Sequence, residues 1–142
     1  MERLEKIMPN ESQIKILYNL LQKRSYSISH KENPSYEQHQ NFVENNPYRH
    51  WFLAIYNSEY VGAIYVKDDN SIGINIDNCI EPGHINNFIN IILDEIEPLP
   101  AIPSVRAAGF HINLAPNNDL LRTTLDKRGC SLIQITYLLE NK

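Results

Sequence analysis

The sequence of 142 residues has few cysteines, no excess of basic residues and no long apolar run. The 13 basic and 17 acidic residues give a net charge of −4. This charge balance argues against a protein that binds nucleic-acid backbones, because such binding requires a basic face. No apolar stretch approaches the length of a membrane span, and the first residues lack the apolar core of a signal peptide. We therefore expect a cytoplasmic protein that binds neither nucleic acid nor membrane.

The two cysteines, Cys79 and Cys130, lie far apart in the chain. A structural zinc site needs four closed ligands, and His30 and His39 are not spaced as a metal pair either, so we expect no metal. Lone cysteines are typically small core residues in a reducing compartment, and we predict this role for both. The length and the 42% apolar content fit one globular domain over residues 1–142.

The N-terminal half predicts a strand, two helices and three further strands. A short first strand over residues 2–8 is stopped by a proline. Asn10 with Gln13, and Ser35 with Gln38, have the spacing of capping boxes, so each pair predicts the start of a helix. Short apolar segments joined by polar turns then predict antiparallel hairpins, with strands over residues 51–57, 59–66 and 71–76.

The C-terminal half predicts helices that alternate with strands. A segment from His84 has a broad apolar face and helical length, and the prolines after it forbid continuation. In a predicted strand over residues 105–114, alternate side chains point to opposite faces. Asn118 opens a helix that ends at Gly129, with a left-handed cap expected there. Residues 132–139 predict the last strand.

The resulting order is β-α-α-β-β-β-α-β-α-β, an α/β fold whose sheet is antiparallel at the start and joined by helical crossovers later. This order resembles the GNAT superfamily of acyl-CoA N-acyltransferases over nearly the whole chain. The segment HQNFVENNPYRHWFLAIYNSEYVGAIYV, residues 39–66, resembles a hairpin of bacterial members, including those that acylate amino sugars. Asn118, the helix after it, Gly129 eleven residues later and the TYLL run resemble the family's ending.

The resemblance implies a GNAT-like mixed sheet with a splayed pair of central strands, the fourth and fifth. Acetyl-CoA or another acyl-CoA would lie in that gap as co-substrate. Its pantetheine would pair with the edge of the fourth strand, and its pyrophosphate would meet the next helix start, where free N–H groups and the helix dipole favour an anion. The residues implied in cofactor binding are Ile74, Asn75, Ile76, Gly83, His84, Ile85, Asn86 and Asn118.

The sequence departs from the family at two places. The family's pyrophosphate motif reads Gln/Arg-x-x-Gly-x-Gly/Ala, and the aligned Ile80, Gly83 and Ile85 agree with it only at Gly83. We expect Ile85 to crowd the phosphates, although backbone donors can still bind them. Many members also use a tyrosine of the last helix as general acid, and Leu125 stands at that position.

Three residues are candidates for proton transfer. His111 would be the general base, because an imidazole accepts a proton near neutral pH; the alternative is a hydrogen-bonded sheet histidine. Asp77 would take the amine proton through a water, or would be a turn residue. Tyr137 would replace the missing acid, or would lie in the core with its hydroxyl at the rim.

Three functions stay open at this point. The first is an N-acetyltransferase that moves an acyl group to the amine of a small molecule, an amino sugar among them, by direct attack in a ternary complex. The second is a non-catalytic GNAT-like module with a degenerate CoA site, and the third is a pure assembly protein. A homodimer also stays open, because exposed sheet ends in this fold often pair.

Overall fold

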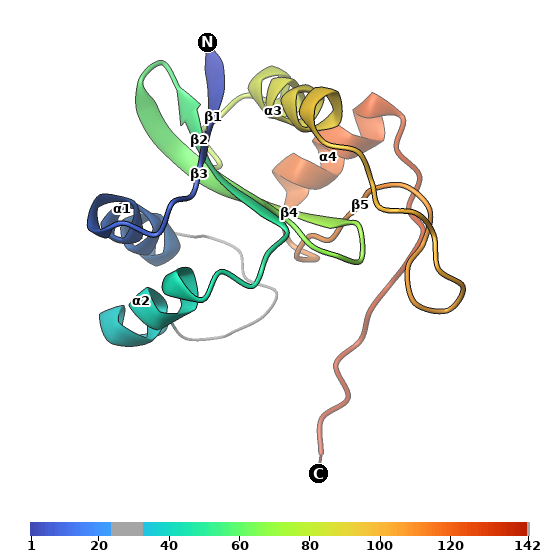
Figure 1. The fold of residues 1–142 in the computed structure, drawn as a ribbon. Helices are drawn as coiled ribbons and strands as arrows, with labels where there is room; N and C mark the ends of the chain where they lie inside the picture. Colours follow the sequence, from blue (N-terminus) through green and yellow to red (C-terminus); the bar gives the residue numbers. More distant parts are fainter. Residues whose placement is uncertain (24–32, 142) are drawn as a thin grey trace.

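The computed structural model describes residues 1–23 and 33–141, in which a five-stranded sheet is covered by helices on both faces (Figure 1). The predicted polar loop between the first two helices lies largely outside the described residues. The strands are β1 (Glu2–Lys6), β2 (His50–Tyr56), β3 (Glu59–Val66), β4 (Ser71–Ile76) and β5 (His111–Ile112). The helices are α1 (Glu11–Gln22), α2 (Tyr36–Glu44), α3 (Pro82–Glu95) and α4 (Asp119–Arg128).

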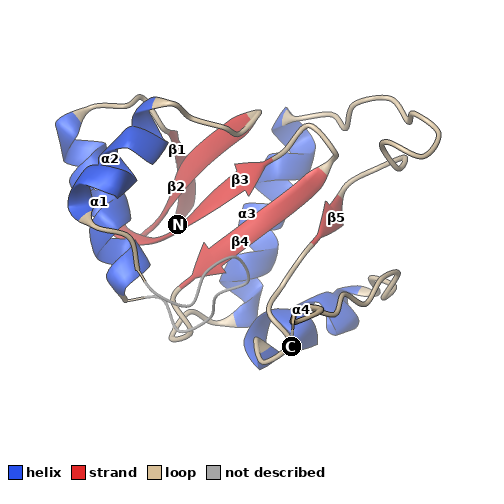
Figure 2. Ribbon diagram, turned by 90° about the horizontal axis from the view of Figure 1, so that it is seen from below, coloured by secondary structure: helices blue, strands red, loops and turns tan. Residues whose placement is uncertain are grey.

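The strands lie in the order β1-β2-β3-β4-β5. The first four form antiparallel ladders, and β5 joins β4 in parallel, which confirms the predicted mixed sheet. The β4–β5 ladder holds two residue pairs, Ser71 with His111 and Ile72 with Ile112. Because β4 continues to Ile76, the two strands have no ladder over the second half of β4. Figure 2 shows β5 as a short strand beside the much longer β4.

Two apolar cores lie on opposite faces of the sheet. The α3 and α4 side includes Ile64, Val66, Ile72, Ile74, Phe88 and Ile92. The α1 and α2 side includes Ile14, Leu17, Val43, Trp51 and Leu53. Phe110, Ile112 and Leu114 pack against the first of these cores, as the predicted alternation requires. His111 therefore points to the face that carries α1 and α2.

The helix ends follow the predicted caps. The Asn10 side chain accepts a hydrogen bond from Gln13 N, and Ser35 forms a complete capping box with Gln38. Asn118 Oδ1 accepts from Leu121 N at 3.2 Å, and Gly129 ends α4 with a φ of 90°. The third helix begins at Pro82 instead of His84, because a proline is well tolerated in the first turn.

The predicted last strand over residues 132–139 is wrong, so the observed order is β-α-α-β-β-β-α-β-α. The segment has a strand-like sequence, yet a strand also needs a neighbour for its backbone groups. No backbone hydrogen bond joins residues 131–141 to another described residue. The predicted strand over 105–114 is likewise reduced to His111–Ile112, since the residues before it form a looped segment.

Both cysteines are exposed, so the prediction that they are core residues is wrong. Cys79 lies in the turn between β4 and α3, where its backbone N donates to Asp77 Oδ1 at 2.9 Å. Cys130 directly follows the left-handed glycine that ends α4. Turns and helix ends of this kind lie at the surface whatever side chain they carry.

Candidate active site

Strands β4 and β5 are hydrogen-bonded only at Ser71 and Ile72, and we call this the closed end of the pair. Asn70 stabilises it. This residue of the β3–β4 turn is fully buried and has a φ of 70°, a conformation that asparagine tolerates. Its Nδ2 donates to the carbonyl oxygens of Leu99 (2.9 Å) and Ala107 (3.1 Å), and its Oδ1 accepts from Leu99 N (2.8 Å). Its carbonyl oxygen accepts from His111 N at 3.1 Å. Asn70 thus holds the segment after α3 through its side chain and the start of β5 through its backbone carbonyl.

The neighbouring Asp69 stabilises the same turn. Its Oδ1 accepts hydrogen bonds from Ser71 N at 2.9 Å and Ser71 Oγ at 2.5 Å. Burial raises the pKa of this carboxyl, but the two hydrogen bonds from Ser71, helped by Lys67 and His111, outweigh it and hold the pKa below its usual value. The charged form of Asp69 is therefore part of the closed end.

Beyond Ile72 and Ile112 the strands part and leave a cavity. The space within it that a water molecule can occupy is about 20 Å³, room for about one water. We call it the gap. It is lined by Tyr65, Gly73, Ile74, Asn75, Asn113, Leu114, Ala115 and Asn118. The three asparagines come from β4 and from the stretch that joins β5 to α4, so hydrogen-bonding groups from two sides converge on the gap.

Tyr65 forms one wall of the gap. Tyr65 pairs with Gly73 across the β3–β4 ladder. If Gly73 had a β-carbon, that atom would lie 2.0 Å from Cζ of Tyr65 and 2.4 Å from the Tyr65 hydroxyl oxygen. The tyrosine ring therefore lies across the bare backbone of Gly73. On its other side it stacks on Tyr48, with ring centroids 4.1 Å apart. The sequence analysis missed Tyr65, although a glycine opposite an aromatic residue in a hairpin is a signal of such close approach.

The start of α3 has open space where the resemblance places the pyrophosphate. Glu81 caps the helix without a side-chain hydrogen bond, and a β-carbon at Gly83 would meet nothing within 4 Å. Ile85 is 2% exposed and belongs to the core. Its side chain packs into the core, which argues against the expected crowding of the phosphates.

A second missed residue, Arg128, places a positive charge beside α3. From the last turn of α4 its Nη1 donates to Asn86 Oδ1 at 3.2 Å and its Nη2 to Asn90 Oδ1 at 2.7 Å. The guanidinium thus lies beside the second and third turns of α3. The separation of 42 residues between Arg128 and Asn86 hides this pairing from the sequence.

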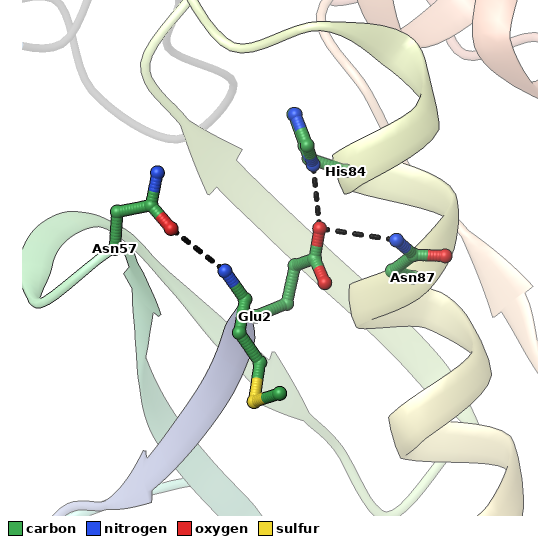
Figure 3. A network of polar contacts seen from close by, with 5 residues as sticks. Glu2, Asn57, His84 and Asn87 are labelled. Atoms are coloured by element: carbon green, nitrogen blue, oxygen red, sulfur yellow. Dashed lines mark hydrogen bonds and ion pairs between the residues drawn. The ribbon is translucent and has the colours of Figure 1, made fainter.

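His84 is engaged on the other side of α3 (Figure 3). Its Nδ1 lies 2.5 Å from Glu2 Oε2, and Asn87 Nδ2 donates to the same oxygen at 3.0 Å. The hydrogen bonds from Asn87 and His84 hold the pKa of Glu2 below its usual value. Tyr56 also contacts the imidazole, with ring centroids 4.1 Å apart. A phosphate at this helix start would compete with Glu2 for His84.

The three candidates for proton transfer lie in three places, and none of them lines the gap. His111 is at the closed end, paired with Ser71. Asp77 is exposed and accepts from Cys79 N in a turn. Tyr137 is 83% exposed in the C-terminal segment. Leu125, at the position of the family's acid, is 9% exposed within the core.

The described part of the chain holds no cluster of three or more side chains suited to a metal ion. Across residues 1–23 and 33–141, none of the helices has the length and apolar character needed to cross a membrane.

No protein-family model and no curated protein matches the sequence. Solved structures do match. The Campylobacter jejuni N-acetyltransferase PseH in complex with acetyl coenzyme A superposes with a TM-score of 0.61 at 11% identity, over 96% of this chain and 92% of that one. An aminoglycoside N-acetyltransferase in complex with CoA gives 0.60 at 8% identity, over 100% and 95%. An aminoglycoside acetyltransferase from an uncultured soil metagenomic sample gives 0.55 at 10%, over 100% and 99%. The chain therefore has the fold of the GNAT N-acetyltransferases.

Proposed function

We propose that the protein is an acyl-CoA-dependent N-acyltransferase that transfers an acetyl group from acetyl-CoA to the amine of a small molecule, with amino sugars as the first acceptors to test. The observation that carries this proposal is the parting of β4 and β5 into a lined gap directly after a firmly held closed end. A similar fold binds acetyl-CoA in PseH and CoA in an aminoglycoside acetyltransferase. We place the protein in the cytoplasm, where its two exposed thiols would stay reduced.

The edge of β4 supplies the binding groups for the cofactor in this proposal. On the side of β5, residues 73–76 have no strand partner among the described residues. An extended pantetheine with two amides would pair there as an added strand does. The pyrophosphate would then meet the α3 start at Gly83, with the dipole and Arg128 offsetting the missing Arg or Gln of the motif. Asn118, which lines the gap, would contact the same ligand.

The chemistry asks for little covalent help from the protein. The amine must lose a proton, lie near the thioester carbonyl and find a donor for the developing oxyanion. His111 remains our candidate base, since it points to the face on which Tyr65 lies. Asp77 and Tyr137 are the alternatives for proton transfer. Tyr65, with its hydroxyl at the gap, is our candidate to protonate the leaving thiolate in place of the tyrosine that Leu125 replaces.

The test is turnover of acetyl-CoA. The protein is incubated with acetyl-CoA and a panel of amino sugars, aminoglycosides and simple amines, and free CoA thiol is measured. We expect thiol release that needs both protein and amine, and that is reduced in Tyr65→Phe. Absence of release with every amine, together with no heat of acetyl-CoA binding in calorimetry, would contradict the proposal.

A second candidate function is a non-catalytic module that binds CoA or a related nucleotide. It is favoured by the pyrophosphate motif, which is kept only at Gly83, and by the buried Leu125. Binding of acetyl-CoA without thiol release across the whole panel would decide for this candidate.

A further inference from the structure

One row of paired residues crosses the sheet on the face that carries α1 and α2. Trp51 of β2 pairs with Tyr65 of β3, and Tyr65 pairs with Gly73 of β4. Directly paired residues point to the same face of a sheet, and both Trp51 and Tyr65 pack in the apolar core of this face. Gly73 contributes no side chain to the row, so β4 leaves room for the side chain of its neighbour.

The Tyr65 side chain occupies this room and reaches the gap. If Gly73 had a β-carbon, that atom would lie 2.2 Å from Cε2 of Tyr65, much closer than carbon atoms pack. Neighbouring strands lie about 4.8 Å apart, a distance that a tyrosine side chain spans. Tyr65 therefore begins on β3, crosses the bare backbone of β4 and lines the gap beyond it. A glycine inside a strand is typical of such a close approach.

Tyr48, in the segment before β2, supports the ring of Tyr65. The two rings are stacked, with 4.1 Å between their centroids and 13° between their planes. Tyr48 also contacts Trp51, with centroids 4.9 Å apart, and Phe42, with centroids 5.9 Å apart, both in edge-to-face geometry. Stacked and edge-to-face pairs are the arrangements that aromatic rings favour. The packing of these rings therefore fixes Tyr48, and Tyr48 in turn holds the ring of Tyr65.

We propose that Tyr48 and Gly73 are positioning residues, which together set the Tyr65 hydroxyl at the thioester end of the bound acyl-CoA. This role rests on the proposed function, in which the pyrophosphate lies at Gly83 and the pantetheine pairs with residues 73–76 of β4. The pantetheine then runs from the end of β4 back toward Gly73, so its sulfur comes to the place where the Tyr65 ring crosses the strand.

The step that depends on this placement is the departure of the thiolate. The neutral amine nitrogen bonds to the carbonyl carbon, the C–S bond breaks, and its electron pair leaves on sulfur. The Tyr65 hydroxyl gives sulfur its proton, and the phenolate recovers a proton that the nitrogen releases through water. A displacement of about 1 Å in such a group can cost on the order of 100-fold in rate, so the supports of the ring matter as well as its hydroxyl.

The first test measures the position of the ring without any reaction. The α-protons of Gly73 lie against the Tyr65 ring, and its ring current should move their proton resonances upfield of those in Tyr65→Leu. We expect Tyr48→Phe, which keeps a stacking ring, to preserve this shift, and Tyr48→Leu to lose most of it. A shift that is absent from the wild type, or that Tyr48→Leu leaves unchanged, overturns the proposal whether or not the protein transfers acyl groups.

The second test measures turnover of acetyl-CoA with the amine that reacts fastest in the panel. We expect Tyr48→Leu and Gly73→Ala to lower kcat by on the order of tenfold or more. The KM for acetyl-CoA should stay within about twofold, because the supports act on the transition state and not on binding. Tyr48→Phe should restore kcat, and Tyr48→Leu carries the test if circular dichroism shows Gly73→Ala to be unfolded.

The two ways to fail can be told apart. Absence of turnover in the wild type overturns the proposed function and this role with it. A wild type that turns over, together with an unchanged kcat in Tyr48→Leu, overturns the positioning role alone. A Tyr48→Phe variant as slow as Tyr48→Leu also overturns it, because the stacked ring would then not be what matters.

Discussion

The two ends of the β4–β5 pair use polar side chains in opposite ways. At the closed end, Asn70 is fully buried and all its side-chain hydrogen bonds go to backbone groups. At the open end, Asn75, Asn113 and Asn118 line a gap. The same residue type thus fixes the strands at one end and faces an empty space at the other.

This difference explains how the pair of strands can open without coming apart. The ladder has only two residue pairs, so it cannot hold β5 in place alone. Asn70 and the Asp69–Ser71 turn add the missing contacts on the closed side. On the open side, residues 73–76 of β4 have no partner strand among the described residues, and the proposed function assigns this edge to the cofactor.

The largest expected effect comes from breaking the closed end. Asn70→Ala removes three side-chain hydrogen bonds and leaves the backbone groups of Leu99 and Ala107 without these partners. It also keeps the positive φ, which is unfavourable for alanine. We expect a loss of about 3 kcal/mol in the free energy of unfolding, measured with urea. Asn70→Gly, which relieves the φ, should lose about 1 kcal/mol less.

The matched control for Asn70 is an asparagine of the open end. Asn75→Ala should change the free energy of unfolding by no more than about 0.5 kcal/mol, because this side chain faces the gap. Equal losses in Asn70→Ala and Asn75→Ala would remove the distinction between the two ends.

The next effect comes from filling the open end. Asn113 is exposed and lines the gap, so Asn113→Trp should block a ligand there while leaving stability nearly unchanged. We expect acetyl-CoA affinity in calorimetry to fall at least tenfold. Asn117→Trp, also exposed but outside the gap lining, should bind as the wild type does. If both tryptophan variants bind equally well, the ligand lies elsewhere.

The sequence predicted the fold best where local patterns decide it. The caps at Asn10, Ser35 and Asn118 and the left-handed Gly129 depend on neighbours within a few residues, and all four are present. The meander from β2 to β4 has strong alternation and tight polar turns, so its strands lie within a residue of the prediction. The predicted last strand is wrong because its sequence is that of a strand, while pairing depends on a neighbouring chain segment.

The site was less predictable, because it is built from contacts distant in sequence. The resemblance to the GNAT family predicted a gap beside Ile74 and Asn75, and the structure has a small cavity there. Tyr65 reaches it across a hairpin, and Arg128 reaches α3 from the end of another helix. His111, Asp77 and Tyr137 were chosen by residue type and strand position, and the structure leaves their roles as predictions.

Asn118 allows a finer comparison, because its side chain both holds a backbone group, as Asn70 does, and lines the gap, as Asn75 does. It lines the gap and also caps α4 through Leu121 N. Asn118→Ala should lower the free energy of unfolding by about 1 kcal/mol, the usual cost of a lost cap. Asn118→Asp keeps the capping oxygen and should restore most of that stability in the same urea measurement. A stability of Asn118→Asp as low as that of Asn118→Ala would show that the cap is not the cause.

The smallest effect concerns pH and the contact of Glu2 with α3. The folded pKa of Glu2 is lowered from its ordinary 4.5 by Asn87 and His84. The charged carboxylate therefore stabilises the fold above about pH 4.5, and this contribution is lost as pH falls through the lowered value. Unfolding followed from pH 6 to pH 3 should show a shallower loss in Glu2→Gln than in the wild type. Parallel curves would mean that the contact contributes nothing.

The most direct measurement is a titration of ¹⁵N-labelled protein with acetyl-CoA, followed through its backbone amide resonances. We expect the amide resonances of residues 74–77 and Gly83 to shift, whereas those of Asn70 and Ser71, at the closed end, should not. Unchanged resonances along β4 and at Gly83 at saturating acetyl-CoA would contradict the claim that this gap is the binding site.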